Sequence, residues 1–216
     1  MPTTEGGTTH VHHDGGHPQR CQRDTARETV GAIQNDPALA TFRFRAHNAW
    51  LGGGHSRTSI QGYWGAGQED STRTAPFTLD GDEPPVLLGH NQAPNAVETV
   101  LHGLASCLAI GFAYNAAAQG IEVRSLEFDL EGELDLHGFL GLSEETRAGY
   151  QGITVTYRVD ADATPEQIDE LCSYVQRTSP VLDIISNPVP VTVTRPENHC
   201  ARPRLHPPRS PTDRSK

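Results

Sequence analysis

The sequence predicts an α+β domain in which mainly antiparallel sheets surround one long buried helix. Two observations support this fold class. The expected elements follow the order β-β-β-α-β-β-α-β, so strands come in blocks instead of alternating with helices. Residues 99–119 contain no charged residue, which is typical of a helix enclosed by a protein core. One small sheet cannot cover such a helix, so we expect a homodimer in which two central helices cover each other.

The domain is expected over residues 39–195. Residues 1–38 are predicted to be a flexible, His-rich leader and a short helix, and residues 196–216 a disordered tail rich in Pro and Arg. Hydrophobic residues make up only 35% of the 216 residues. The two ends contain too few of them to offset the entropy cost of ordering.

Charge and targeting signals restrict the classes of partner. The net charge of -10 argues against a nucleic-acid site built on phosphate neutralisation and against a polybasic membrane anchor. Residues 1–20 lack the apolar segment of a signal peptide. We therefore expect a cytoplasmic protein without nucleic-acid or membrane partners. Its cysteines are then free thiols: Cys21, Cys107, Cys172 and Cys200.

The first elements of the domain are expected to be strands. Residues 42–50 alternate apolar and polar side chains, the pattern of a half-buried strand. A Gly-rich turn over 51–55 and a second run over 57–64 predict a hairpin. A third strand is expected over 74–79.

A long helix should begin after Asn95, whose side chain can serve as its N-cap. The uncharged segment 99–119 is long enough to span a bilayer. However, it contains His102 and Asn115, and no Lys or Arg flanks it closely. This pattern favours a buried central helix over a membrane span.

The C-terminal half is expected to add two long strands, a helix and a short strand. The long strands are predicted over 123–136 and 153–160. Thr164 and Gln167 have the spacing of a capping box and predict the start of a second helix. A final short strand is expected over 191–194.

Cys107 is the first candidate for chemistry. It lies mid-helix on the same face as Val100, Leu104 and Gly111. Two interpretations remain open: a buried cysteine acting as a small hydrophobe, and a nucleophilic thiolate that needs a cation from elsewhere in the protein. His102 lies about 140° away around the helix, so a Cys-His pair is not predicted. A hydrogen-bonded core or interface histidine is expected there instead.

The leader contains a cluster of potential metal ligands. Imidazole and thiol groups suit soft metals, but nothing around them would fix their geometry. We therefore predict no metal site and no cofactor. The residues of this cluster are His10, His12, His13, His17 and Cys21.

Several segments together resemble the OsmC/Ohr family, over about residues 40–195. The helix motif Asn95-Ala-Val-Glu-Thr-Val-Leu-His-Gly-Leu-Ala-Ser-Cys107 is the most specific of them. The others are the hairpin Trp50-Leu-Gly-Gly-Gly and the segments Ser179-Pro-Val-Leu-Asp and Asn187-Pro-Val-Pro-Val. Gly65-Ala-Gly-Gln-Glu-Asp70 and Leu134-Asp-Leu-His-Gly-Phe-Leu-Gly-Leu142 resemble one branch of OsmC-like proteins, the branch with Ser in place of the second cysteine.

The resemblance implies an intertwined α+β homodimer with its sites at the subunit interface. The better-known members are peroxiredoxin-like enzymes that reduce organic hydroperoxides in oxidative stress defence. A peroxidatic thiolate attacks the peroxide and becomes a sulfenic acid, a second cysteine condenses with it, and an external dithiol reduces the disulfide. An Arg and a Glu hold and activate the first thiolate.

Position by position, Cys107 matches the peroxidatic cysteine and Ser179 occupies the place of the second one. A hydroxyl cannot form a disulfide, and Cys172 could substitute only if the end of its helix shifts. The usual Glu falls at Val97, with Glu98 next to it as the replacement candidate.

Arg57 in the hairpin is the best candidate for the activating Arg. The expected function is a one-cysteine peroxidase that uses a small external thiol, with Ser179 and His102 as binding residues. Two alternatives remain open. One is a non-enzymatic dimer that binds an apolar or sulfur-containing small molecule, and the other is an enzyme in which Cys107 acts on another electrophile.

Overall fold

The structure is a computed structural model that describes residues 28–195. The predictions for the His-rich cluster, Cys21, Cys200 and the C-terminal tail lie outside the described residues. Within them, residues 28–35 are helical, and a 3-10 turn, η1 (Pro37–Ala40), follows. Asp36 caps this turn by accepting a hydrogen bond from the Ala38 N–H group at 3.1 Å.

The N-terminal strands form two antiparallel three-stranded sheets. The expected strand over 42–50 is divided between them, and so is the one over 57–64. The two expected strands are interrupted next to each other. Phe44 pairs with Tyr63 just before the break, and His47 pairs with Ser59 just after it. One sheet has the order β1 (Arg43–Phe44), β4 (Tyr63–Gly65), β5 (Gln68–Asp70), and the other β2 (His47–Gly52), β3 (His55–Ile60), β6 (Phe77–Gly81).

A loop over 82–92 joins these sheets to the central helix, and it is organised by a buried carboxylate. Asp82 is 3% exposed and accepts hydrogen bonds from the backbone N–H groups of Glu83, His90 and Gln92 at 2.9, 3.0 and 3.1 Å. These bonds hold the pKa of Asp82 below its usual value, although burial opposes the shift. The loop contains the short turn η2 (Pro85–Leu87).

The central helix α2 (Ala96–Gln119) begins where the sequence predicts. Asn95 accepts a hydrogen bond from the Glu98 N–H group, and the Glu98 carboxylate accepts one from the Asn95 N–H group. This capping box satisfies two backbone donors at the helix start. The helix ends at Gly120, whose φ of 78° places it in the left-handed region that glycine adopts readily.

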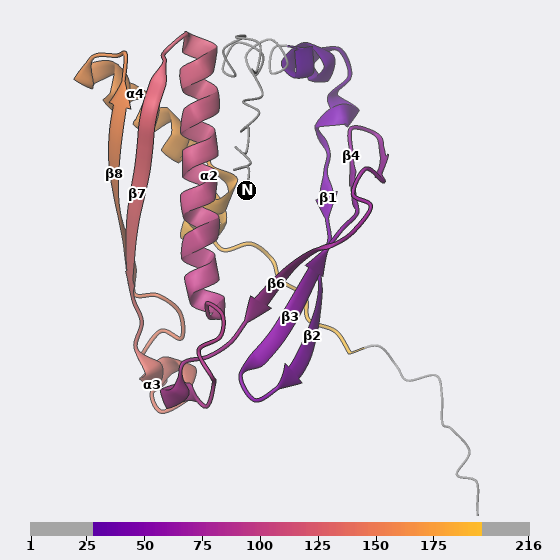
Figure 1. The fold of residues 1–216 in the computed structure, drawn as a ribbon, viewed down its shortest axis with the longest axis vertical. Coiled ribbons are helices and arrows are strands. Elements are labelled where there is room, and N and C mark those ends of the chain that lie inside the picture. The colour runs from indigo at the N-terminus through magenta and orange to yellow at the C-terminus, as the bar shows by residue number, and fades with distance from the viewer. Residues whose placement is uncertain (1–27, 196–216) are drawn as a thin grey trace, which may run out of the picture.

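The C-terminal half packs a two-stranded antiparallel sheet and two helices against α2 (Figure 1). The elements are β7 (Val123–Glu133), α3 (Leu136–Phe139), β8 (Gly152–Ala161), α4 (Pro165–Thr178) and α5 (Pro180–Ser186). The capping box of Thr164 and Gln167 at the start of α4 is confirmed. The sequence did not predict α3 or α5.

The predicted final strand over 191–194 is wrong. This segment has no strand partner among the described residues, and Val191 and Val193 are 78% and 92% exposed. A strand needs a neighbouring edge to satisfy its backbone groups. Val191 and Val193 therefore have the propensity for a strand, but no strand edge pairs with this segment among the described residues.

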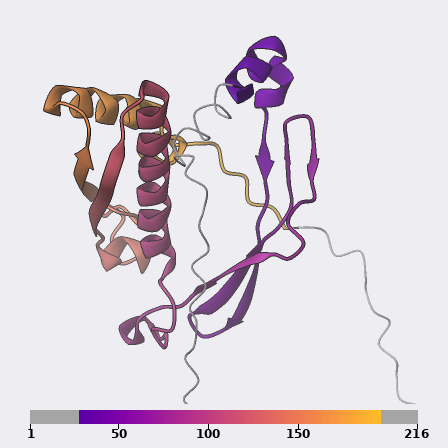
Figure 2. The same ribbon diagram turned by 45° about the horizontal axis from the view of Figure 1, so that its top comes forward.

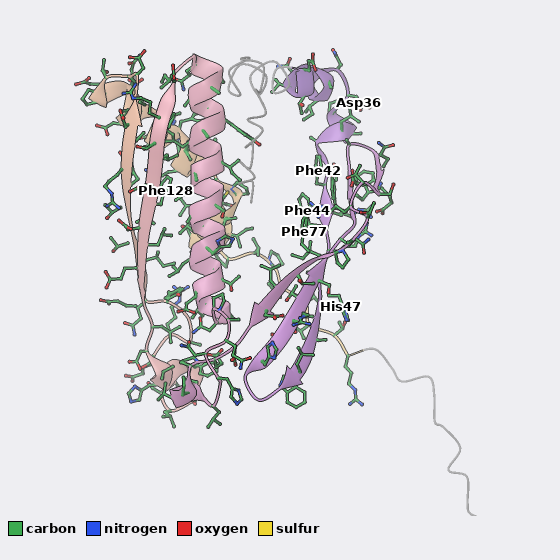
Figure 3. The ribbon with its side chains drawn as sticks, viewed as in Figure 1. Asp36, Phe42, Phe44, His47, Phe77 and Phe128 are labelled. Atoms are coloured by element: carbon green, nitrogen blue, oxygen red, sulfur yellow. The ribbon has the colours of Figure 1, made fainter. Side chains whose placement is uncertain are left out.

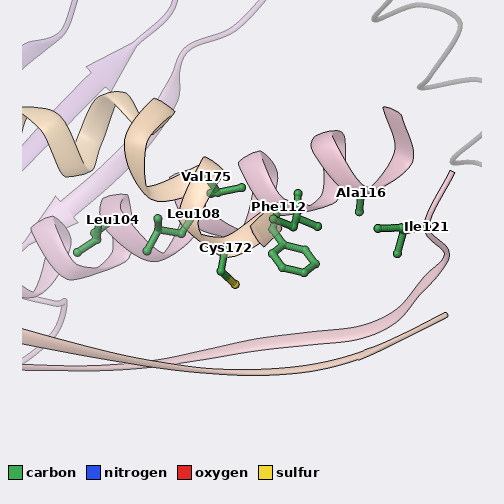
Figure 4. Close-up of a cluster of buried hydrophobic side chains, with 8 residues drawn as sticks. Leu104, Leu108, Phe112, Ala116, Ile121, Cys172 and Val175 are labelled. Carbon is green, nitrogen blue, oxygen red and sulfur yellow. The ribbon is translucent and has the colours of Figure 1, made fainter. Parts of the chain in front are cut away.

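The core of the described residues lies between α2, α4 and the β7–β8 sheet (Figure 4). Leu104 and Phe112 of α2 and Leu171 of α4 are each 1% exposed. The buried cluster comprises Leu104, Leu108, Phe112, Ala116, Ile121, Leu171, Cys172 and Val175.

Only one side of α2 is covered in the single chain, which corrects the expectation of a helix enclosed all round. Val100, Ile110 and Tyr114 are 40%, 52% and 56% exposed. The helix is long and apolar enough to cross a bilayer, a test that core helices also pass. In two views the N-terminal sheets stand apart from the C-terminal half and leave this side of α2 uncovered (Figures 1 and 2).

Candidate active site

The thiol of Cys107 lies halfway along α2, half-buried and directed at the junction of α4 and α5. Its Sγ accepts a hydrogen bond from the Ser179 hydroxyl at 3.2 Å. Ser179 is 4% exposed. The two residues are 72 positions apart in the sequence, and the packing of α5 on α2 brings them together.

The helix cap of α5 fixes the direction of the Ser179 hydroxyl. Ser179 is the N-cap of α5, and its Oγ accepts a hydrogen bond from the Leu182 N–H group at 3.3 Å. A hydroxyl has one proton to donate and two lone pairs. The Leu182 N–H group uses a lone pair, so the proton remains available for the Cys107 sulfur. Pro180 at the first helical position further restricts this turn.

The Ser179 hydroxyl is a hydrogen-bond donor aimed at the Cys107 sulfur. Hydrogen bonds to an ionised acceptor are about twice as strong as bonds between neutral groups. The Ser179 hydroxyl therefore contributes most when the Cys107 sulfur, or an oxygen added to it, carries charge. It does so without a mobile side chain, because both partners belong to helices that pack together.

Cys172 has a different environment. It is 8% exposed on the inner face of α4. Burial raises the pKa of its thiol, and a hydrogen bond with Tyr157 opposes that shift. The same interaction, followed by burial, raises the pKa of Tyr157 to about 12. A buried thiol of raised pKa is a poor nucleophile, so this environment does not favour Cys172 as the partner that resolves Cys107.

Glu98 and His102 do not approach Cys107 within one chain. The Glu98 carboxylate is engaged in the α2 capping box, and it lies nine positions before Cys107, about 13 Å along the helix axis. The His102 side chain is exposed, so the expectation of a core histidine is wrong. Its position at a subunit interface stays a prediction.

Arg57 lies on β3, in the part of the chain that does not pack on α2. Its guanidinium donates two hydrogen bonds to Asp80, at 2.6 and 2.9 Å. This pairing holds the pKa of the Asp80 carboxyl below its usual value. Of the five residues that the sequence singled out, one chain therefore brings together only Cys107 and Ser179.

Tyr150 is a neighbour that the sequence argument missed. Its hydroxyl donates a hydrogen bond to the carbonyl oxygen of Val97 at 2.9 Å, which ties the loop before β8 to the first turn of α2. The ring lies against Gly132 of β7, where an added Cβ would come within 2.6 Å of it. An isolated glycine inside a strand is the signal that could have indicated such a close approach.

Two cavities lie on either side of a boundary formed by Ile153, Val155 and Leu182. The smaller one, about 300 Å³, is lined by Phe112 and Cys172 among others. The larger one, about 400 Å³, is next to the first half of α2. Neither is lined by Cys107.

Comparison with known proteins adds the family context. Residues 89–194, which contain Cys107, Ser179 and the elements that join them, match the model of the OsmC-like protein family. No curated protein matches the chain.

Solved structures share the OsmC-like fold. An OsmC-like protein from Mycoplasma pneumoniae has a TM-score of 0.51 at 14% identity, over 67% of this chain and 88% of that one. An OsmC-like protein of unknown function from Vibrio cholerae has a TM-score of 0.47 at 13% identity, over 65% and 92%. An organic hydroperoxide resistance protein OsmC from Legionella pneumophila has a TM-score of 0.47 at 18% identity, over 69% and 92%.

Proposed function

We propose that this OsmC-like protein is a one-cysteine thiol peroxidase that reduces organic hydroperoxides through Cys107. The observation that supports it is the 3.2 Å hydrogen bond from the buried Ser179 hydroxyl to the Cys107 sulfur. The resemblance implies that the two reacting sulfurs of the family correspond to these two positions. A direct contact between them supports the proposal, in which a hydroxyl takes the place of the second thiol.

The first step is nucleophilic substitution on the peroxide. The Cys107 thiolate attacks one peroxide oxygen, an S–O bond forms, and the O–O bond breaks. The bonding electron pair leaves with the alkoxide, which takes up a proton and departs as an alcohol. Sulfur is oxidised by two electrons to sulfenic acid and the peroxide is reduced by two. The Ser179 hydroxyl donates a hydrogen bond to the Cys107 sulfur while negative charge shifts from the sulfur to the leaving oxygen.

The second step needs a thiol from outside the protein. Because Ser179 cannot form a disulfide, a small thiol condenses with the sulfenic acid, forming an S–S bond and releasing water. A second thiol then attacks the mixed disulfide, restores the Cys107 thiol and leaves as the oxidised disulfide. A reducing compartment such as the cytoplasm supplies such thiols.

We also propose that the working unit is a homodimer, which the exposed apolar surface supports. The uncovered side of α2 presents Ile110 and Tyr114, and exposed apolar patches of this kind mark interaction sites. A second apolar surface lies on the N-terminal sheets (Figure 3), where the Phe42 and Phe44 rings stack at 5.9 Å and Phe77 is 61% exposed. In a dimer whose two chains cross, the N-terminal sheets of each copy can cover the exposed side of α2 in the other copy.

A crossed dimer also offers a source for the cation that the Cys107 thiolate needs. Arg57 belongs to the N-terminal sheets, which do not pack on α2 of the same chain. We propose that Arg57, with Glu98 and His102, completes the site across the interface. The Asp80 carboxylate already orients the Arg57 guanidinium.

The proposed activity is tested by mixing reduced protein with cumene hydroperoxide in a stopped-flow instrument and reading the intact mass afterwards. Wild type should react far faster than free cysteine and gain one oxygen or one thiol on Cys107. Cys107→Ser should lose the reaction, whereas Cys172→Ser should keep it. A wild-type rate equal to that of free cysteine would refute the peroxidase.

The shared site is tested by subunit complementation. Cys107→Ser and Arg57→Gln chains should each be inactive or slow alone. Unfolded and refolded together, they form mixed dimers in which one site combines an intact Cys107 with an intact Arg57. Recovery of part of the wild-type rate is expected. No recovery, with mixed dimers shown by mass spectrometry, would mean that Arg57 does not act across the interface.

A further inference from the structure

The larger cavity has the composition of a small-molecule site. Its volume of about 400 Å³ lies within the range of ligand pockets, which are mostly apolar with a few polar groups at fixed places. Its apolar walls come from α2, β8 and α5, and Val100 is 40% exposed at its edge. The apolar lining is Val100 and Leu104 of α2, Ile153 and Val155 of β8, and Leu182 and Ile185 of α5.

One of the side chains that line this cavity is an exposed cation without an acidic partner among the described residues. Arg147 and Tyr150, from the loop before β8, line it together with Gln151. Within residues 28–195, Arg147 forms no ion pair with a carboxylate, although acidic residues outnumber basic ones in the chain.

This arginine differs from others in the described part of the chain. Apart from Arg195, the last of the described residues, those arginines either pair with a carboxylate or stack on an aromatic ring, as expected for an exposed guanidinium on an acidic protein. The paired ones are Arg45, Arg57, Arg124 and Arg158, and the stacked ones are Arg43, Arg73 and Arg177.

We propose that this cavity binds a free amphipathic carboxylate, with its alkyl chain among the apolar side chains and its carboxylate paired with Arg147. A guanidinium binds carboxylates in a bidentate geometry. Glu98, whose charge acts on the neighbouring Tyr150, forms no ion pair with Arg147 within the described residues, and its carboxylate accepts a hydrogen bond from the Asn95 N–H group. The site goes beyond the proposed peroxidase, since Cys107 does not line it and the ligand need not react.

Binding is tested by isothermal titration calorimetry on the full chain, with decanoate below its micellar concentration as the probe. Decanol and decyltrimethylammonium have the same chain with a neutral and a cationic headgroup. Decanoate should bind at least about tenfold more tightly than either, because only it pairs with Arg147. Equal binding of decanoate and decanol would overturn the role of charge.

Variants locate the site. Arg147→Gln should weaken decanoate binding about tenfold and leave decanol unchanged, and Arg147→Lys should fall between. Arg177→Gln, an exposed arginine stacked on Tyr174, is the matched control and should bind like wild type. Val100→Trp should weaken both ligands by filling the cavity.

Two further outcomes are decisive. Cys107→Ser should bind decanoate like wild type, which separates this site from the thiol chemistry, so either proposal can fail without the other. No heat of binding for decanoate in folded wild-type protein would overturn the inference.

Discussion

Replacing Ser179 with alanine tests the contact on which the proposed function depends. The change removes two interactions at once: the hydroxyl donated to Cys107 and the cap accepted from the Leu182 N–H group. Loss of a helix N-cap costs about 1 kcal/mol. A lost hydrogen bond contributes about 1 kcal/mol more. The free energy of unfolding should therefore fall by roughly 2 kcal/mol.

A matched variant separates the two contributions. Thr164 caps α4 by the same kind of bond, in which Thr164 Oγ1 accepts from the Gln167 N–H group at 3.3 Å, and it has no contact with Cys107. Thr164→Ala should cost only the cap, about 1 kcal/mol. Both are measured by urea denaturation at one protein concentration, since the stability of an oligomer depends on concentration.

The chemical effect should belong to Ser179 alone. The pseudo-first-order rate of Cys107 oxidation by cumene hydroperoxide should fall about tenfold in Ser179→Ala, which corresponds to about 1.4 kcal/mol of lost stabilisation. It should stay at the wild-type value in Thr164→Ala. Equal stability losses in both variants, with unchanged oxidation rates, would refute the argument that the hydroxyl acts on sulfur.

Three single contacts lead to further predictions. Ser179→Cys places two sulfurs where Ser179 Oγ and Cys107 Sγ lie 3.2 Å apart. Diamide should therefore form a disulfide between Cys107 and the introduced cysteine, measured as the loss of both thiols to Ellman's reagent. Two thiols that stay free would contradict the geometry. The pKa of Asp82 is lowered in the folded state, so the contribution of its carboxylate to the free energy of unfolding is complete above the ordinary value of 3.8 and is lost as pH falls through the folded-state pKa. The difference in urea midpoint between wild type and Asp82→Asn should therefore shrink below pH 3.8. A difference that stays constant with pH would contradict this prediction. Gly132→Ala puts a Cβ 2.6 Å from the Tyr150 ring and should lower the free energy of unfolding by about 1–3 kcal/mol. Tyr150→Phe is the control, because it keeps the ring and adds no Cβ at Gly132. An unchanged melting temperature of Gly132→Ala would show that the ring moves freely.

Local signals determined much of the helical structure. The capping boxes of Asn95 with Glu98 and of Thr164 with Gln167 are both present, because a cap involves residues only three positions apart. The strands β7 and β8 were predicted from their own alternation, and each has its alternate side chains half-buried. In these elements, propensity and pattern agree with the packing.

The sequence was less informative where a segment depends on a distant neighbour. Residues 42–50 alternate as one strand would, yet they divide between two sheets because their partner strands do. Residues 191–194 have strand propensity but no edge to join among the described residues. The segment 180–186 is apolar and branched, yet it is helical because Ser179 caps it.

The candidate site shows the same division. The sequence alone determined that Cys107 lies mid-helix. It also indicated that Ser179, with its hydroxyl side chain, corresponds to the second cysteine of the OsmC/Ohr proteins that the chain resembles. Only the tertiary structure decided that these side chains touch and that Glu98 and Arg57 are engaged elsewhere in the chain. The physical reason is range: a helix cap is decided within one turn, whereas a contact across 72 residues depends on how α5 packs against α2.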